Sequence, residues 1–366
     1  MKIKYWVFSV AALAVAAGAS LAFGTGPVYS EKAVGRYLGQ ISSMIAGRPL
    51  TKDELDRIKR ERGAAIQPIL ENWLYDKFFA DSAQVMIQTQ LGTSGTNNGI
   101  NYNLPGNLAK YLARNALPYS EILRAGYCVD DQQRKIACDT GAPFTAGILT
   151  TRAYMLTNFG RYNLGRAGKM MRYFACLDYP MDKALQPPLP REKLIPLFQT
   201  LEAKPGSDFG NGLACYTCHS QFGAHAQPYV KFDSQGLYRP EATGLQDPAL
   251  EAGKSFNGLN ASHMIEPSDS ASERSQMFGE PVNNLRGAAL VLAKSDKFLE
   301  CATQNALHFY LRMTDSEASG IDPRVIREIV TAVKKNDSDP SLNELLLKAL
   351  THQSVIESVL ASGEER

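Results

Sequence analysis

Cys215-Tyr216-Thr217-Cys218-His219 is a CxxCH pentapeptide within a chain of 366 residues. Two thiols at this spacing can form thioether bonds to the two vinyl groups of one haem, and the adjacent histidine can bind the iron from the proximal side. Such a pentapeptide arises rarely by chance in a chain with 6 cysteines and 5 histidines. The motif therefore predicts one covalently attached haem c, with Cys215 and Cys218 as attachment points and His219 as the iron ligand.

The second axial position of the iron decides what such a haem can do, because a thioether, a second imidazole and an open site give different chemistry. Met277 lies in an irregular stretch just before a predicted helix and is the favoured distal ligand. Met264 and His263 share one loop and are alternatives, as is an open site. Arg239 is a candidate partner for a haem propionate through its planar guanidinium, and a structural ion pair with Asp233 is the other interpretation.

Other classes of site have little support in the sequence. Cys215, Cys218, His219 and His225 offer atoms that zinc binds, but adjacent ligands at 218 and 219 span a tetrahedron poorly. The chain has no GxSxG, P-loop, HExxH or dinucleotide-binding glycine pattern.

The first 22 residues have the pattern of a secretory signal peptide. Lys2 and Lys4 form its positive start, Trp6 to Val15 its apolar stretch, and Ser20-Leu21-Ala22 its cleavage site. Haem c is attached outside the bacterial cytoplasm, so the predicted location is the periplasm, with a retained N-terminal anchor and peripheral membrane association as the alternative. Removal of this segment takes the formal net charge from +2 to about 0, which argues against a nucleic-acid partner.

Four cysteines lie outside the haem motif: Cys128, Cys138, Cys176 and Cys301. In an oxidising compartment an even number of remaining cysteines predicts disulfides, and buried free thiols are the alternative. Cys128 and Cys138 bracket the polar segment 129–135, which is typical of an exposed turn, so their pairing needs only a local reversal of the chain. By elimination, the second predicted disulfide joins Cys176 to Cys301.

Apolar residues recur at helical spacing along most of the chain, which predicts a mostly α fold with few strands. Thr51-Lys52-Asp53-Glu54 has the pattern of a capping box. The Gly- and Asn-rich stretch 93–107 is predicted to be a long loop, and residues 220–279 an irregular wrap around a haem. The predicted helices cover 31–46, 51–61, 64–91, 107–116, 119–125, 146–158, 165–176, 282–293, 295–312, 323–335 and 341–360.

Pro187-Pro188-Leu189-Pro190 stops any helix and is typical of a connector. We therefore expect a signal peptide at 1–22, a helical N-terminal domain at 23–190 and a cytochrome c-like haem-binding domain at 191–366. In the second domain, the irregular haem wrap is expected to lead into C-terminal helices.

Three longer stretches carry a further pattern. They read GAPFTAGILTTRAYMLTNFGRYNLGRAGKMMRYFACLDYP (141–180), ACYTCHSQFGAHAQPYVKFDSQGLYR (214–239) and FGEPVNNLRGAALVLAKSDKFLECATQNALHFYLR (278–312). These stretches resemble blocks of the exported bacterial proteins built from planctomycete-type cytochrome c modules. The resemblance implies one CxxCH within a run of helical modules, and it implies that Cys176 and Cys301 are family positions.

Together these observations predict a periplasmic mono-haem c-type cytochrome that carries single electrons between redox proteins, such as other cytochromes or a membrane complex. One alternative is a haem enzyme of peroxidase- or oxidase-like type with an open distal site. The other is a haem-bearing subunit of a larger electron-transfer complex. The long segment before the motif, more than a simple carrier needs, keeps both alternatives open.

Overall fold

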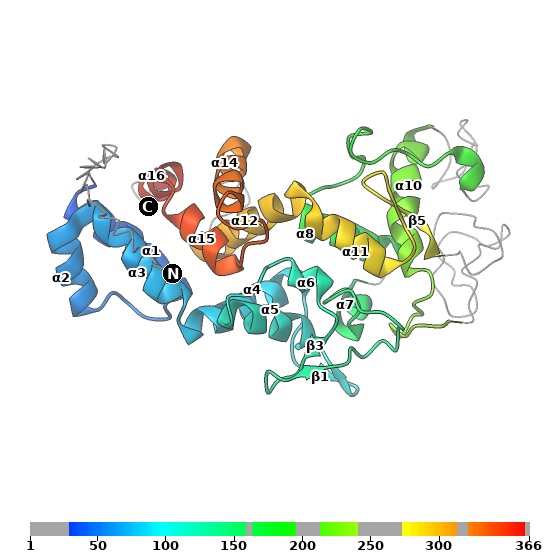
Figure 1. Cartoon of the computed structure of the whole chain (residues 1–366), viewed down its shortest axis with the longest axis horizontal. Helices are drawn as coiled ribbons and strands as arrows, with labels where there is room; N and C mark the ends of the chain where they lie inside the picture. The colour runs from blue at the N-terminus through cyan, green and yellow to red at the C-terminus, as the bar shows by residue number, and fades with distance from the viewer. Residues whose placement is uncertain (1–28, 159–162, 195–212, 241–272, 313–320, 363–366) are drawn as a thin grey trace, which may run out of the picture.

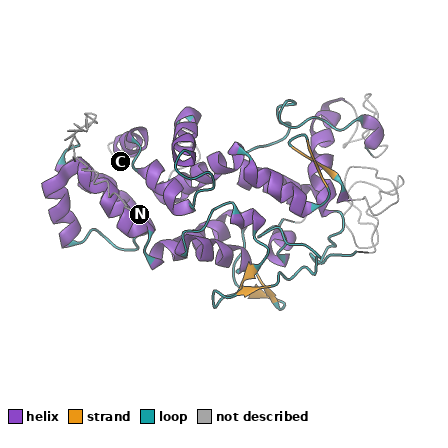
Figure 2. Ribbon diagram, in the orientation of Figure 1, coloured by secondary structure: helices purple, strands orange, loops and turns teal. Residues whose placement is uncertain are grey.

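The structure is a computed structural model that describes residues 29–158, 163–194, 213–240, 273–312 and 321–362 (Figure 1). Helices dominate these residues, and the named strands among them form three separate, short, two-stranded antiparallel hairpins (Figure 2). The predicted mostly α fold is confirmed. The predicted signal peptide lies outside the described residues. None of the described helices combines the length and apolar composition needed to cross a membrane.

Several of the N-terminal helices begin where a side chain accepts one of their free backbone N–H groups. Ser30 caps the first helix, and Thr51 and Glu54 form the predicted capping box. The stretch 64–91 is two helices, because Asp76 caps the second one. The elements of this half are α1 Glu31–Ile45, α2 Lys52–Glu61, η1 Arg62–Ala65, α3 Ile66–Leu74, α4 Lys77–Leu91, α5 Leu104–Arg114, α6 Glu121–Arg124, α7 Arg152–Thr157 and α8 Leu164–Ala175.

The long loop predicted at 93–107 is wrong in its extent, because a hairpin and the start of α5 occupy much of it. The side-chain amides of Asn101, Asn103 and Asn107 all donate to the carboxylate of Asp131, at 3.1, 3.3 and 2.8 Å. This carboxylate lies in the turn of a second hairpin, so the two hairpins hold each other in place. The strands are β1 Thr96–Asn97, β2 Ile100–Asn101, β3 Cys128–Val129 and β4 Lys135–Ile136.

The C-terminal half contains the helix of the CxxCH motif and a third hairpin. The predicted helix 341–360 is two helices in the structure. The elements are η3 Arg191–Lys193, α10 Leu213–Ala226, η4 Gln227–Tyr229, β5 Ser275–Met277, β6 Glu280–Val282, α11 Leu285–Lys294, α12 Asp296–Leu311, α14 Pro323–Lys334, α15 Leu342–Leu350 and α16 Gln353–Ser362.

The C-terminal helices pack back onto the N-terminal ones. Figure 1 shows α15 and α16 beside α1 and α3, at the opposite end of the molecule from α10. Tyr37 of α1 donates to the carbonyl of Leu350 (2.6 Å), and the Asn343 amide donates to the carbonyl of Leu74 (2.6 Å). One contiguous hydrophobic core therefore contains residues from both sides of the domain boundary predicted after residue 190.

Both predicted disulfides are confirmed. Cys128 and Cys138 are joined across the β3–β4 hairpin, with a sequence separation of 10. Cys176, at the end of α8, is joined to Cys301 in α12, with a sequence separation of 125. The second bridge holds the segment that follows α8 against the C-terminal helices.

Replacing Cys176 and Cys301 together by alanine is expected to lower the free energy of unfolding by about 5 kcal/mol, because a bridge that closes a long segment removes much entropy from the unfolded chain. The matched double variant at Cys128 and Cys138 should lose about 3 kcal/mol, because its closed segment is short. Urea unfolding of both variants beside the parent chain measures the difference. A larger loss for the local pair would contradict this account.

Candidate functional site

The CxxCH motif lies in the first turns of α10. Residues at positions i, i+3 and i+4 of an α-helix share one side, so Cys215, Cys218 and His219 project from the same face. All three side chains are half-buried. Neither thiol is in a disulfide, whereas the other four cysteines are paired.

Burial favours the uncharged forms of His219 and Cys218. It lowers the pKa of His219 to about 4, so the imidazole is neutral at physiological pH. Burial, and then the neighbouring Cys215, raises the pKa of the Cys218 thiol. A neutral imidazole has the nitrogen lone pair that a metal ligand needs, and this face therefore offers one such nitrogen beside two thiols that are not in a disulfide.

The segment that follows α8 and includes η3, residues 176–194, runs along α10, and we call it the strap. Tyr216 donates its hydroxyl hydrogen to the carbonyl of Leu189 (2.8 Å), and the Leu189 N–H donates to the carbonyl of Ser220 (3.1 Å). The Gln221 amide nitrogen donates to the carbonyls of Met181 (3.0 Å) and Gln186 (2.7 Å). The predicted connector around Leu189 is thus bonded directly to the motif helix, which the sequence pattern did not indicate.

His225 lies near the end of α10 and is fully buried. Its Nδ1 lies 2.5 Å from the Tyr179 hydroxyl oxygen, and its Nε2 lies 2.8 Å from Gln186 Oε1. Burial lowers the pKa of His225 to about 3, so the ring is neutral. Because both ring nitrogens already have partners in the strap, His225 is part of the support of α10. Among the described residues, no group of three or more His, Cys, Asp or Glu side chains could hold a metal ion, as the zinc alternative would need.

Met277, the predicted distal ligand, is fully buried at the end of β5. Phe278 and Gly279 form the two-residue turn into β6, with φ values of 51° and 79°. The turn directs the Phe278 N–H to Gln186 Oε1 (2.7 Å). Met277 is thereby held in the core by the same strap residue that contacts His225.

The β5–β6 hairpin packs on the last turns of α10. Ser275 donates its hydroxyl hydrogen to the Ala224 carbonyl at 2.5 Å, and the rings of Phe278 and His225 meet edge-on with centroids 6.4 Å apart. These contacts lie about 8 Å along the helix axis beyond His219. The distal role of Met277 stays a prediction, and the alternatives Met264 and His263 lie outside the described residues.

Arg239 forms the ion pair with Asp233 that was the second interpretation of this residue. Its Nε lies 2.7 Å and an Nη 2.6 Å from Asp233 Oδ2. Asp233 Oδ1 accepts the N–H groups of Gln235 and Leu237, which closes the turn after η4. The irregular wrap predicted at 220–279 is wrong for its first residues, because α10 continues to Ala226. A propionate contact for Arg239 stays a prediction.

Arg166 in α8 is a buried residue that sequence reasoning missed. Its guanidinium donates to the carbonyls of Phe232 (2.9 Å), Asp233 (2.8 Å) and Met155 (3.1 Å) and to Asn163 Oδ1 (2.8 Å). Burial lowers its pKa to about 10, which still leaves it charged. Arg166 therefore fastens the turn that follows α10 to α8. An arginine in a helical pattern gives no signal of such a role.

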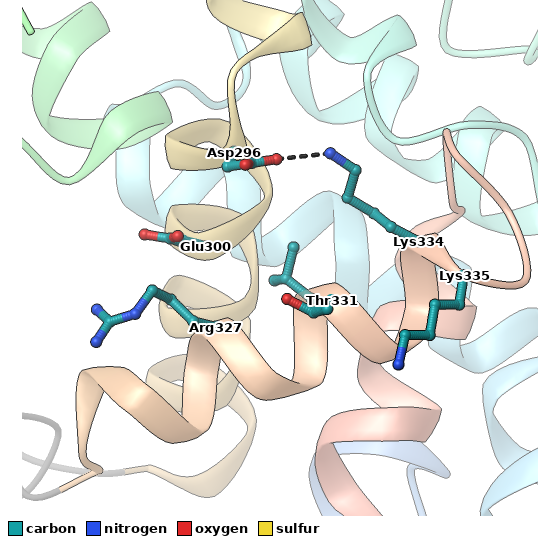
Figure 3. Close-up of a pocket in the computed structure, with 7 residues that line it drawn as sticks. Asp296, Glu300, Arg327, Thr331, Lys334 and Lys335 are labelled. Carbon is teal, nitrogen blue, oxygen red and sulfur yellow. Dashed lines mark hydrogen bonds and ion pairs between the residues drawn. The ribbon is translucent and has the colours of Figure 1, made fainter.

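A depression of about 390 Å³ lies on the surface between α12 and α14 (Figure 3). Asp296 and Lys334 form an ion pair of 2.6 Å at its edge. Its remaining lining residues are Glu300, Arg327, Val330, Thr331 and Lys335. This lining contains no cysteine, histidine or methionine, so it offers no soft metal ligand, and it lies away from α10 in Figure 1.

Comparisons of this chain with protein-family models, curated proteins and solved structures find no match. The interpretation of the site rests on its own residues. Two unpaired thiols and one neutral imidazole on one helix face match the donor set that a covalently bound haem c requires.

The stability of the chain is expected to fall as the pH drops from about 6.5 to about 3, partly through His225. In the unfolded chain this ring gains a proton near its ordinary pKa of 6.5, whereas in the folded chain burial delays protonation to about 3. The unfolded state then binds more protons, and each such group contributes about 1.4 kcal/mol per pH unit. His225→Gln should flatten the slope by about this amount between pH 6 and pH 4, measured by urea unfolding. Parallel slopes for the two chains would show that His225 does not titrate in this way.

Proposed function

We propose that this chain is an exported mono-haem c-type cytochrome that carries single electrons in the periplasm. The observation that carries the proposal is the shared face of Cys215, Cys218 and His219 at the start of α10. Both thiols are unpaired there, although the chain's other four cysteines are oxidised to disulfides. In an oxidising compartment, two neighbouring thiols with no other role would form a disulfide. Thioether bonds to haem are therefore the simplest explanation for this unpaired pair.

Each residue of the face has a distinct role in this proposal. Cys215 and Cys218 form the thioether bonds, and His219 is the axial ligand. Bound haem c supplies a one-electron couple between ferrous and ferric iron. Burial keeps His219 neutral, so no proton has to leave the imidazole before it binds iron. Phe222 packs beside His219, with ring centroids 5.9 Å apart.

The other predictions about location and partners fit this role. The two disulfides are compatible with export to an oxidising compartment. A mature chain of formal charge about 0 has no electrostatic preference for nucleic acid. We propose other redox proteins, such as cytochromes or a membrane complex, as electron donors and acceptors. The resemblance to planctomycete-type cytochrome c modules supports the same assignment.

Cys215→Ser with Cys218→Ser is expected to abolish covalent haem attachment, because no sulfur remains to form a thioether. Mass spectrometry of the chain matured in an export host that attaches haem c should find one haem mass on the parent chain and none on this variant. The double variant Cys128→Ser with Cys138→Ser is the matched control and should keep the haem. A parent chain that matures without haem mass would refute the proposal.

Met277→Leu is expected to change the axial bands in the absorption spectrum of the holoprotein, because leucine has no thioether to bind the iron. Leucine has nearly the volume of methionine, so the free energy of unfolding should change by less than about 1.5 kcal/mol. This substitution separates ligation from packing better than Met277→Ala, which would leave a cavity in the core. Unchanged axial bands would exclude Met277 as the ligand, and a ferric haem that binds cyanide readily would favour the open-site enzyme.

A further inference from the structure

Contacts between three aromatic rings lead from Tyr179 in the strap, through Phe222, to His219, the proposed iron ligand. The Phe222 ring lies 5.9 Å from the His219 imidazole, centroid to centroid, with an angle of 40° between the planes. Tyr179 of the strap packs on Phe222, with centroids 3.6 Å apart and an angle of 32°. Phe222 therefore neighbours both His219 and Tyr179, so a shift of Tyr179 that moves Phe222 would change the packing of the His219 ring.

Hydrogen bonds fix the position of Tyr179, and their directions follow from one backbone group. The Phe278 N–H can only donate, so the Gln186 atom that it contacts must be the oxygen. His225 Nε2 contacts this same oxygen at 2.8 Å, so Nε2 carries the ring hydrogen. His225 is neutral, which leaves Nδ1 with a lone pair, and the Tyr179 hydroxyl donates to it. The tautomer of His225 is thus determined by a hydrogen bond from the β5–β6 turn.

We propose that Tyr179 is a positioning residue for His219, and that His225 and Gln186 hold Tyr179 in the place where it sets the orientation of the ligand imidazole through Phe222. This inference rests on the proposed haem-binding function and adds residues that the CxxCH motif does not contain. Partners around a ligating histidine commonly fix its ring orientation through a hydrogen bond. Here the packing of Phe222 beside His219 does so. The hydrogen bond is made by Tyr179, which packs on Phe222.

The test compares three variants of the full chain. Tyr179→Leu removes the ring that packs on Phe222, and Tyr179→Phe keeps the ring but loses the hydrogen bond to His225. Tyr37→Phe is the matched control, because it also removes one tyrosine hydroxyl bond, to the carbonyl of Leu350 (2.6 Å), and lies in α1 at the opposite end of the molecule from α10. Circular dichroism checks that each variant keeps the helical fold.

In the holoprotein, Tyr179→Leu should shift the g values of the ferric EPR signal and the midpoint potential, because the imidazole plane is no longer held. Tyr179→Phe should give a smaller shift in the same direction, and Tyr37→Phe should give none. The inference is wrong if Tyr179→Leu leaves both quantities unchanged, or if Tyr37→Phe moves them as far, since a general loss of stability would act equally through both tyrosines.

A failure of the haem proposal can be told apart from a failure of this inference. Absence of haem mass refutes the proposed function alone. The ring contacts are still decided by proton NMR of the haem-free chain, in which 5 histidines give few ring signals. Tyr179→Leu should shift the His219 ring signals, because Phe222 moves, and Tyr37→Phe should leave them in place. Unshifted His219 signals in Tyr179→Leu would overturn the positioning role.

Discussion

Hydrogen bonds between the strap and α10 hold the candidate haem helix in position. The Gln221 side chain makes three of them, to the N–H and carbonyl of Met181 and to the carbonyl of Gln186. One such bond contributes about 1 kcal/mol net, but a buried backbone group left without a partner costs about 1–3 kcal/mol. The main effect of these bonds is therefore to fix the position of α10 relative to the strap. Because Cys176 is bonded to α12, the strap is held at its first residue as well as along α10.

Helix α8 connects the strap and α10 to the rest of the hydrophobic core. The Arg166 guanidinium carries a charge inside the protein and is surrounded by carbonyl oxygens, which replace the water that the charge has lost. Two of those carbonyls belong to the turn at Phe232 and Asp233, directly after η4. Helix α10 and the turn after η4 are thereby both held against α8. The strap, which begins at the end of α8, holds α10, and Arg166 holds the turn.

Features with a local cause could be predicted from the sequence. The capping box at Thr51 and Glu54 acts within one helical turn, and the bridge between Cys128 and Cys138 needs only a hairpin. The helices followed from apolar residues that recur every three or four positions, since that spacing directs one face to the core. The CxxCH motif itself was recognised from its spacing, but the grouping of Cys215, Cys218 and His219 on one face depends on α10, a helix that was not predicted.

Contacts between distant segments could not be predicted in this way. Gln221 bonds to backbone groups, which every residue has, so no sequence pattern distinguishes its partners from others. The amides of 93–107 suggested a loop because asparagine favours turns, yet a carboxylate from another hairpin satisfies three of them. Helix α10 was not among the predicted helices, because its residues lack amphipathic periodicity, as expected for a helix that has the strap on one side and β5 on another.

The two free thiols of α10 could react with each other and form a disulfide. Cys215 and Cys218 are close enough on α10 to threaten disulfide formation in the compartment that oxidises the other four cysteines. A disulfide forms when a thiolate attacks, so its rate depends on the fraction of thiol that has lost its proton. Burial and the neighbouring Cys215 raise the pKa of Cys218, and thus lower that fraction. The packing around α10 therefore slows disulfide formation, which would compete with the proposed attachment of haem, in addition to holding His219 neutral.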